Sequence, residues 1–252
     1  MPVPRPAASA APAPVLREGG LRVVVAANSF ACPALSSLVL RDHAPVPPRI
    51  FDITRPVFAG MPVWPGDAPC SLAWTDHIGE GGANVAALSC GVHTGTHADG
   101  PYHVLADGAR IGDVPLGAYL GQARVVDVNG ARVLDAEWVE AHLAARCERL
   151  LVRTRAWTRP DLLPAAWPAF DEAAARLLVA RGVRLVGTDA PSPDPAEAHD
   201  LPVHRVLLGA GIAILENLML DDVEMGAYEL VALPLRLAEA DAAPVRAVLV
   251  ER

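Results

Sequence analysis

The chain has 252 residues, of which 52% are hydrophobic, so it is long enough to bury one sizeable core. Its formal net charge of −8, with no lysine-rich or arginine-rich block, argues against nucleic acid as a partner. The apolar runs at 21–27 and 35–40 are too short to span a bilayer, and four scattered cysteines predict reduced thiols in a cytoplasmic protein.

The first 49 residues differ in composition from the rest of the chain. Residues 1–14 are almost entirely proline, alanine, valine and serine, which cannot form a packed core, and the prolines at 45–48 make a stiff spacer. We therefore predict that residues 1–49 are a disordered or dispensable extension and that residues 50–252 form one folded domain. A secretory signal is the alternative, although polar residues interrupt its apolar run.

A tryptophan stands in the first turn of the predicted domain. Trp64 lies in the segment PVWPGD at 62–67, where two prolines and a glycine predict a turn. Such a tryptophan either covers a local core or offers its ring to an aromatic ligand, and the residues alone leave both interpretations open.

A predicted strand at 85–92 leads into a cluster of histidines in the segment GVHTGTHADGPYH at 91–103. Its metal-binding residue types all stand at odd positions: His93, His97, Asp99 and His103. In extended backbone, residues at even separations share one face, and the threonines, glycines and proline disfavour a helix here. Imidazole and carboxylate are standard ligands for zinc or manganese, so this face predicts a metal site. A purely structural cluster is the other interpretation.

The rest of the chain predicts more strands than helices. Apolar runs predict strands at 121–128, 149–154, 183–188, 212–218, 228–235 and 245–250. Asp135 is placed to cap a helix over 136–145, and Asp171 to cap one through Ala180 that stops at Gly182. Because strands and helices do not alternate strictly, we predict an α+β domain with a mixed sheet rather than a doubly wound one.

Two residues in the C-terminal half are candidates to complete a metal site. His204 lies in a predicted short helix, and Glu216 ends the alternation of Ile212, Ile214 and Glu216, which places its carboxylate on the face of two buried isoleucines. Burying a carboxylate without a partner destabilises a fold by several kcal/mol, so Glu216 needs a cation or strong hydrogen-bond donors. A salt bridge to an arginine is the alternative for Glu216, and a core or surface position is the alternative for His204.

The string HTGTHADGPYH resembles the H-x-G-T-H-x-D-x-P-x-H signature of the cyclase family of metal-dependent hydrolases. The resemblance extends from about residue 50 to the C-terminus. Further blocks resemble the kynurenine formamidase branch of that family: FDIT at 51–54, WPGD at 64–67, ILENL at 214–218 and YELVALPLR at 228–236. One position departs from the branch, because Gly100 stands where many of its members carry alanine.

The resemblance implies a fold and a ligand set. The fold is a swivelling β/β/α domain that assembles as a homodimer or a higher homo-oligomer. The implied cofactor is a pair of divalent metal ions, with zinc the first expectation and manganese the second. The residue types that match place His93, His97 and Asp99 on the first ion and His204 on the second, with Asp99 and Glu216 bridging to the second.

The resemblance also implies the reaction. It is hydrolysis of N-formyl-L-kynurenine to L-kynurenine and formate in tryptophan degradation, so the expected partner is that small molecule. His103 matches the catalytic histidine, which takes a proton from water and returns it to the departing aniline nitrogen. Trp64 is expected to stack on the aryl ring of the substrate.

Three other functions compete with this interpretation. The first is another amide hydrolase of the same family, such as an isatin-hydrolase-like enzyme that opens a cyclic amide. The second is a non-catalytic module that uses the metal for stability. The third, a serine hydrolase, is disfavoured because the chain contains no G-x-S-x-G segment.

Overall fold

The computed structural model describes residues 47–79, 82–143 and 146–251. The predicted extension at 1–49 therefore lies outside the described residues except for its last three positions. Arg49, the last of them, already begins the first strand, β1 (Arg49–Asp52). No helix in the described ranges is both long and apolar enough to cross a membrane.

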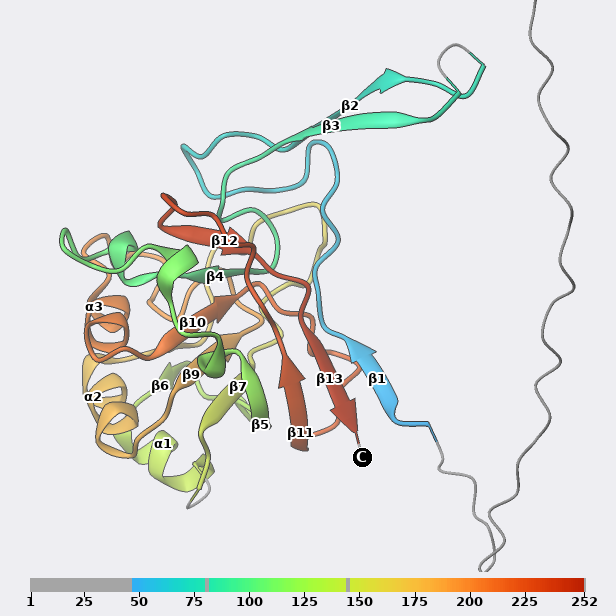
Figure 1. Cartoon of the computed structure of the whole chain (residues 1–252). Helices are drawn as coiled ribbons and strands as arrows, with labels where there is room; N and C mark the ends of the chain where they lie inside the picture. Colours follow the sequence, from blue (N-terminus) through green and yellow to red (C-terminus); the bar gives the residue numbers. More distant parts are fainter. Residues whose placement is uncertain (1–46, 80–81, 144–145, 252) are drawn as a thin grey trace, which may run out of the picture. The chain divides into compact units, whose positions relative to one another are not determined.

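In the described residues, nine strands form one mixed sheet. Their bounds are β1 (Arg49–Asp52), β4 (His97–Asp99), β5 (Leu120–Asp127), β7 (Arg149–Arg153), β9 (Leu185–Thr188), β10 (Ala213–Glu216), β11 (Gly226–Val231), β12 (Ala242–Pro244) and β13 (Val248–Glu251). Their order is β1-β13-β11-β5-β7-β9-β10-β4-β12 (Figure 1). The central strands β5, β7, β9 and β10 run parallel, and the neighbours at both ends are antiparallel. The predicted α+β class with a mixed sheet is thus confirmed.

Three α-helices within the described ranges lie along one face of this sheet (Figure 1). They are α1 (Ala136–His142), α2 (Glu172–Ala180) and α3 (Pro202–Gly209), and α2 packs against both of the others. The two predicted caps are confirmed, because Asp135 accepts a hydrogen bond from the Trp138 N–H (2.8 Å) and Asp171 from the Ala174 N–H (2.7 Å).

The parallel strands are buried on both faces, which explains their continuous apolar runs. Along β7, Leu150 and Val152 pack with the helices, whereas Leu151 belongs to a second cluster on the opposite face. Neighbouring residues of β9 divide in the same way, Val186 toward the helices and Leu185 away from them. Two apolar layers therefore fix the central strands, and each fully buried side chain of this kind contributes roughly 1.5–3 kcal/mol.

The smaller elements lie outside the main sheet. β2 (Ser71–Asp76) pairs only with β3 (Val85–Ser89) in an antiparallel hairpin, and β6 (Val133–Leu134) pairs with β8 (Ala169–Phe170). Three short 3₁₀ helices lie between β4 and β5: Pro101–His103, Ile111–Asp113 and Leu116–Ala118.

Several predicted boundaries differ from the structure. The strand predicted at 85–92 ends at Ser89, and all five residues of β3 are exposed, because this strand belongs to the hairpin and not to the core. The strands predicted at 228–235 and 245–250 are shorter in the structure: β11 ends at Val231 and β13 begins at Val248. The segment before β13 forms the separate strand β12 against β4. The helix predicted at 136–145 ends at His142, and residues 144–145 lie outside the described ranges.

Candidate metal centre

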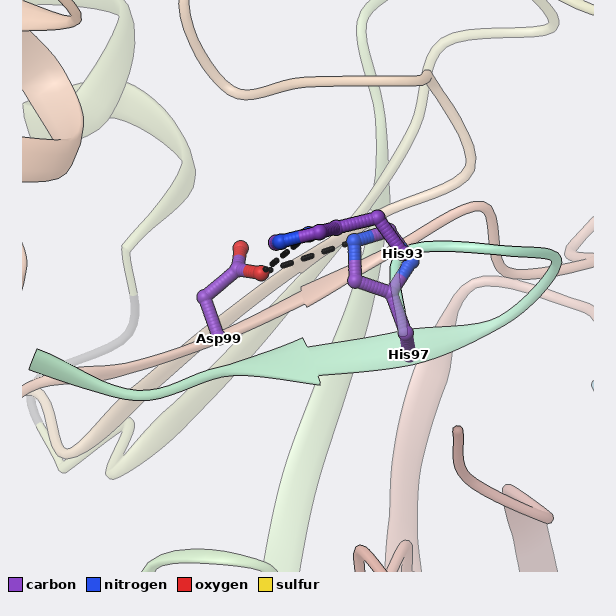
Figure 2. A group of neighbouring side chains, drawn as sticks. All are labelled: His93, His97 and Asp99. Atoms are coloured by element: carbon purple, nitrogen blue, oxygen red, sulfur yellow. Dashed lines mark ion pairs between the residues drawn. The ribbon is translucent and has the colours of Figure 1, made fainter. Parts of the chain in front are cut away.

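The histidine motif turns a corner before it becomes a strand. His93 lies in the turn before β4, whereas His97 and Asp99 lie on β4 itself, two residues apart and on one face. Gly95 has φ of +67° in this turn, a conformation that glycine adopts readily. The three side chains converge (Figure 2), with Asp99 Oδ1 lying 3.1 Å from His93 Nδ1 and 3.5 Å from His97 Nε2.

The register between β10 and β4 brings Glu216 to this cluster. Glu216 stands directly opposite His97 in the antiparallel pair, and residues opposite one another share a face of the sheet. Glu216 Oε2 lies 3.2 Å from His97 Nε2, and Glu216 is only 5% exposed. The next position, Leu215 opposite Ala98, turns into the apolar cluster on the other face.

Helix α3 supplies the other histidine. His204 lies in its first turn and is buried, with Nε2 at 3.1 Å from Glu216 Oε1 and 3.4 Å from Asp99 Oδ2. Two groups of potential ligands thus share one carboxylate: His93, His97 and Asp99 form the first, and Asp99, His204 and Glu216 the second. Within each group the ligand atoms lie within 4.8 Å of one another.

The buried oxygen and nitrogen atoms at the centre are suited to a cation. Among the described residues, His97 Nε2, both carboxylate oxygens of Asp99 and Glu216 Oε1 are buried and form no hydrogen bond of good geometry, although they lie 3.1–3.5 Å from one another's nitrogen and oxygen atoms or from those of His93 and His204. Buried polar atoms of this kind are rare unless a metal or another ligand satisfies them. Imidazole and carboxylate are also the donors that zinc and manganese bind, so the residues fit a divalent metal.

Neighbouring acceptors fix the protons on two of these rings. His97 Nδ1 lies 2.9 Å from the carbonyl oxygen of Gly95, and His204 Nδ1 lies 2.6 Å from Asp194 Oδ2. Because a carbonyl or carboxylate oxygen accepts, each Nδ1 carries a proton and each neutral ring presents the lone pair of Nε2 to the centre. Asp194 is fully buried and also accepts from the backbone N–H groups of Val203 and His204.

A further carboxylate joins two histidines of the motif. Asp241 Oδ2 lies 3.0 Å from His93 Nε2 and 3.0 Å from His103 Nδ1. The ring of His103 is 4.4 Å from that of His93 and 5.6 Å from that of His204, centroid to centroid. His103 is therefore adjacent to the centre, at the end of a 3₁₀ helix (Pro101–His103).

Sequence reasoning missed Asp194 and Asp241. Asp241 is separated from His103 by 138 residues, and its alanine-rich surroundings carry no motif. Asp194 lies in a proline-rich turn that is typical of any surface loop. Only the folded chain brings either carboxylate to its histidine.

The opposing charges shift the pKa values of the cluster. Burial disfavours the charged form of His97, but the negative charges of Asp99 and Glu216 outweigh it and raise its pKa. Burial also lowers the pKa of His93, but the carboxylates of Asp241 and Asp99 beside its ring outweigh burial and raise the pKa to about 10. Burial acts to raise the pKa of Asp99, yet the facing histidines hold it well below its usual range. The carboxylates thus favour protonation of the facing histidines, and the histidines favour ionisation of Asp99.

The centre opens into a cavity of about 230 Å³. His93, His97, His103, His204 and Glu216 line it, and so does Trp64. Trp64 is 41% exposed and meets Trp167 edge-to-face, with ring centroids 6.1 Å apart. All the site residues predicted from the sequence thus lie together, while the role of each stays a prediction.

The histidine motif lies in a region that is similar to known proteins. The family model described as “Putative cyclase” matches residues 51–195. The chain is 46% identical over 209 residues to a kynurenine formamidase from Paracidovorax citrulli (strain AAC00-1), covering 81% of this chain and 97% of that protein. It is 48% identical over 209 residues to a kynurenine formamidase from Delftia acidovorans (strain DSM 14801 / SPH-1), covering 80% of this chain and 97% of that protein.

Solved structures share the fold. A “predicted metal-dependent hydrolase” from Bacillus stearothermophilus is 29% identical with a TM-score of 0.68, covering 82% of this chain and 100% of that chain. Isatin hydrolase A from Labrenzia aggregata is 24% identical with a TM-score of 0.71, covering 81% of this chain and 94% of that chain. At that lower identity the likeness to isatin hydrolase concerns the fold alone.

Proposed function

Because this chain belongs to the Cyclase family, we propose that it is a metal-dependent amidohydrolase that converts N-formyl-L-kynurenine to L-kynurenine and formate. The observation that carries the proposal is the identity of 46–48% to two kynurenine formamidases over about four-fifths of the chain. The paired ligand groups around Asp99, beside a cavity that Trp64 lines, support the same chemistry.

The proposed cofactor is two divalent ions, zinc first and manganese second. His93, His97 and Asp99 would hold one ion, His204 and Glu216 the other, with Asp99 and Glu216 shared between them. When bound, such ions polarise a carbonyl oxygen and lower the pKa of water toward neutrality. Metal analysis of the purified protein tests this part, since fewer than two ions per chain would contradict it.

His103 is the proposed proton carrier. Its Nδ1 faces the carboxylate of Asp241 at 3.0 Å, which fixes the ring and leaves Nε2 for the substrate. His103 takes a proton from water as the water oxygen adds to the formyl carbon. It returns that proton to the aniline nitrogen as the carbon–nitrogen bond breaks, so the products are formate and a free amine.

Trp64 is the proposed contact for the aryl ring. It lines the cavity and is held on one side by Trp167, so the rest of its indole is free to meet an aromatic substrate. Trp64→Ala is expected to raise KM more than it lowers kcat, and unchanged kinetics would contradict this role.

A homodimer or a higher homo-oligomer is the proposed assembly. The β2–β3 hairpin extends away from the nine-stranded sheet (Figure 1) and exposes apolar side chains at Leu72, Trp74, Val85 and Leu88. A two-stranded hairpin alone is marginally stable in water, and exposed apolar patches are typical of interfaces. Light scattering tests the assembly, because a mass of 26.4 kDa in solution would mean a monomer.

The cytoplasm is the proposed location. Cys70, Cys90 and Cys147 are free thiols in the described part of the chain, as is usual for proteins of reducing compartments. Fractionation of the source cells tests this, and recovery outside the cytoplasm would contradict it.

The decisive experiment removes and restores the metal. The protein is stripped with a chelator and reloaded with zinc or manganese, and kynurenine absorbance is followed after N-formyl-L-kynurenine is added. Isatin is assayed in parallel. Metal-dependent turnover of the formamide is the expected result. Turnover of isatin alone would favour the cyclic-amide alternative, and no turnover of either by the loaded protein would favour a non-catalytic metal module.

A further inference from the structure

A buried arginine lines the cavity without an ion-pair partner. Arg55 is 9% exposed, and its guanidinium forms no hydrogen bond or ion pair with any residue that the structure describes. Its Nε is buried and unsatisfied. Arginine is almost never buried to this degree without a paired anion, so the N–H groups of this guanidinium remain available to bind one.

One threonine hydroxyl ties Arg55 to the metal centre. The backbone N–H of Arg55 donates to Thr96 Oγ1 (2.8 Å), and the same hydroxyl donates to the carbonyl oxygen of Asn217 (2.7 Å). Thr96 precedes His97, and Asn217 follows Glu216. Arg55 and Asn217 therefore flank the two facing ligands of β4 and β10.

The guanidinium of Arg55 is positioned by an aromatic ring and has no carboxylate in ion-pair contact among the described residues. Its guanidinium carbon lies 3.9 Å from the ring centroid of Trp157, which orients the plane of the fork. Burial lowers the pKa of Arg55 to about 10, so it stays a cation at neutral pH, and Asp189 and Asp221 favour that form from a distance. The carboxylate of Asp189 already accepts from the backbone N–H of Thr154 (2.7 Å).

Asn217 brings a second unsatisfied polar group to the same cavity. It is 8% exposed, and within the described ranges its Oδ1 is buried with no hydrogen-bond partner. The backbone of Asn217 has φ of 56°, a region that asparagine tolerates better than most residues. The cavity thus offers a cationic donor fork and a neutral amide acceptor close to the metal centre.

We propose that Arg55 and Asn217 bind the α-amino-acid end of the substrate, Arg55 its carboxylate and Asn217 its ammonium group. A guanidinium fork matches the two oxygens of a carboxylate, and an amide oxygen accepts from an ammonium N–H. The proposal rests on the proposed function, because N-formyl-L-kynurenine carries this zwitterion at the end remote from the formyl group. It makes Arg55 a specificity-determining residue.

The test compares two substrates in the intact protein. 2′-Formamidoacetophenone keeps the aryl formamide and the ketone of N-formyl-L-kynurenine but lacks the amino-acid end. Arg55→Gln is expected to lower the ratio of kcat/KM for N-formyl-L-kynurenine to that for the acetophenone by about 10- to 100-fold, mostly through KM. Arg55→Lys keeps the charge without the fork and should recover part of the ratio.

Arg49→Gln is the matched control. Arg49 also stacks on an aromatic ring, with its guanidinium carbon 4.3 Å from the centroid of Phe51, but it does not line the cavity. The control should keep the substrate ratio of the original protein. An equal loss on both substrates in Arg55→Gln would mean that Arg55 only packs on Trp157, and that result, or an unchanged ratio, would overturn the proposal.

Substrate analogues keep the proposal testable if the variants do not fold. The original protein should hydrolyse the carboxamide and the deamino analogue of N-formyl-L-kynurenine with lower kcat/KM, and equal values would overturn the assignment. If the protein hydrolyses no formanilide at all, the proposed function fails by itself. Calorimetric binding of L-kynurenine against 2-aminoacetophenone, before and after Arg55→Gln, then decides the role of Arg55 separately.

Discussion

Asp194 determines how His204 faces the centre. Its buried carboxylate accepts from the His204 ring at 2.6 Å and from two backbone N–H groups at the start of α3. Asp194→Asn replaces one acceptor oxygen with a donor, so the ring loses its fixed orientation. We expect metal affinity to fall about 10- to 100-fold, measured by competition with a chelator.

Asp135→Asn makes the same chemical change at the start of α1, where the carboxylate caps a helix without touching the centre. This control should leave metal affinity unchanged. If both variants lose affinity equally, the effect of Asp194 is a general loss of stability and not the orientation of His204.

His103 lies outside the two groups of candidate ligands that share Asp99, although its ring nitrogen forms a third such group with His93 and Asp241. His103→Ala is expected to keep the metal content and lower kcat by about 10²- to 10⁴-fold, because general acid–base catalysis contributes that much. Metal analysis and steady-state kinetics on one preparation check both parts. Loss of metal in this variant would show that His103 is a ligand. The control is His142→Ala in helix α1, which should change neither the metal content nor kcat.

At the scale of elements, the pairing of β10 with β4 builds the centre. A shift of one residue would place Leu215 opposite His97 and turn Glu216 to the other face. The apolar alternation of β10, buried on both sides, opposes such a shift. The register that positions two ligands is therefore held by core packing.

Helix α2 supports this arrangement from outside the site. Asp171 caps it through the Ala174 N–H, and the helix packs against α3, which carries His204. Asp171→Ala is expected to cost about 1 kcal/mol in the free energy of unfolding and to leave kcat/KM unchanged. Urea denaturation and an activity assay check this. A loss of activity in the folded variant would show that α2 positions His204 more directly than its contacts indicate.

At the scale of the whole molecule, the sheet core and the metal centre contribute separately to stability. The two apolar clusters comprise most of the buried side chains, and the centre lies toward one end of the sheet. Removal of the metal by a chelator is therefore expected to leave a folded protein with a lower Tm. The difference in Tm from the metal-loaded protein should increase with the free metal concentration of the loaded sample, and adding metal back should restore the Tm. Complete unfolding on chelation, seen by circular dichroism, would favour the structural metal module.

We propose that residues 1–45 are dispensable for the reaction. The family match begins at residue 51, and the described sheet begins at Arg49. A chain that starts at Val46 is expected to keep the kcat/KM and the Tm of the full chain. A loss of either quantity would show that the N-terminal segment contributes to the domain.

The sequence predicted the class of fold, and with the family resemblance it predicted candidate ligands that the fold brings together. A short motif carries three histidines and an aspartate within eleven residues, and a carboxylate at the end of a buried apolar run is informative because its burial is costly. Both helix caps were also predictable, since a cap is a local interaction between residues three positions apart. Strand boundaries near the C-terminus were less accurate, because β12 exists only through its pairing with β4.

Only the tertiary structure decided which polar groups support and extend the centre. Asp241, Asp194 and Arg55 stand in segments without a recognisable motif, and each acts on residues that the fold brings to it. Sequence motifs contain information only about residues that are close along the chain. The contacts of these three residues depend instead on strand register and on the placement of α3 against β10. For that reason the candidate metal ligands could be proposed from residue types and the family resemblance, and the carboxylates and the arginine around them could not.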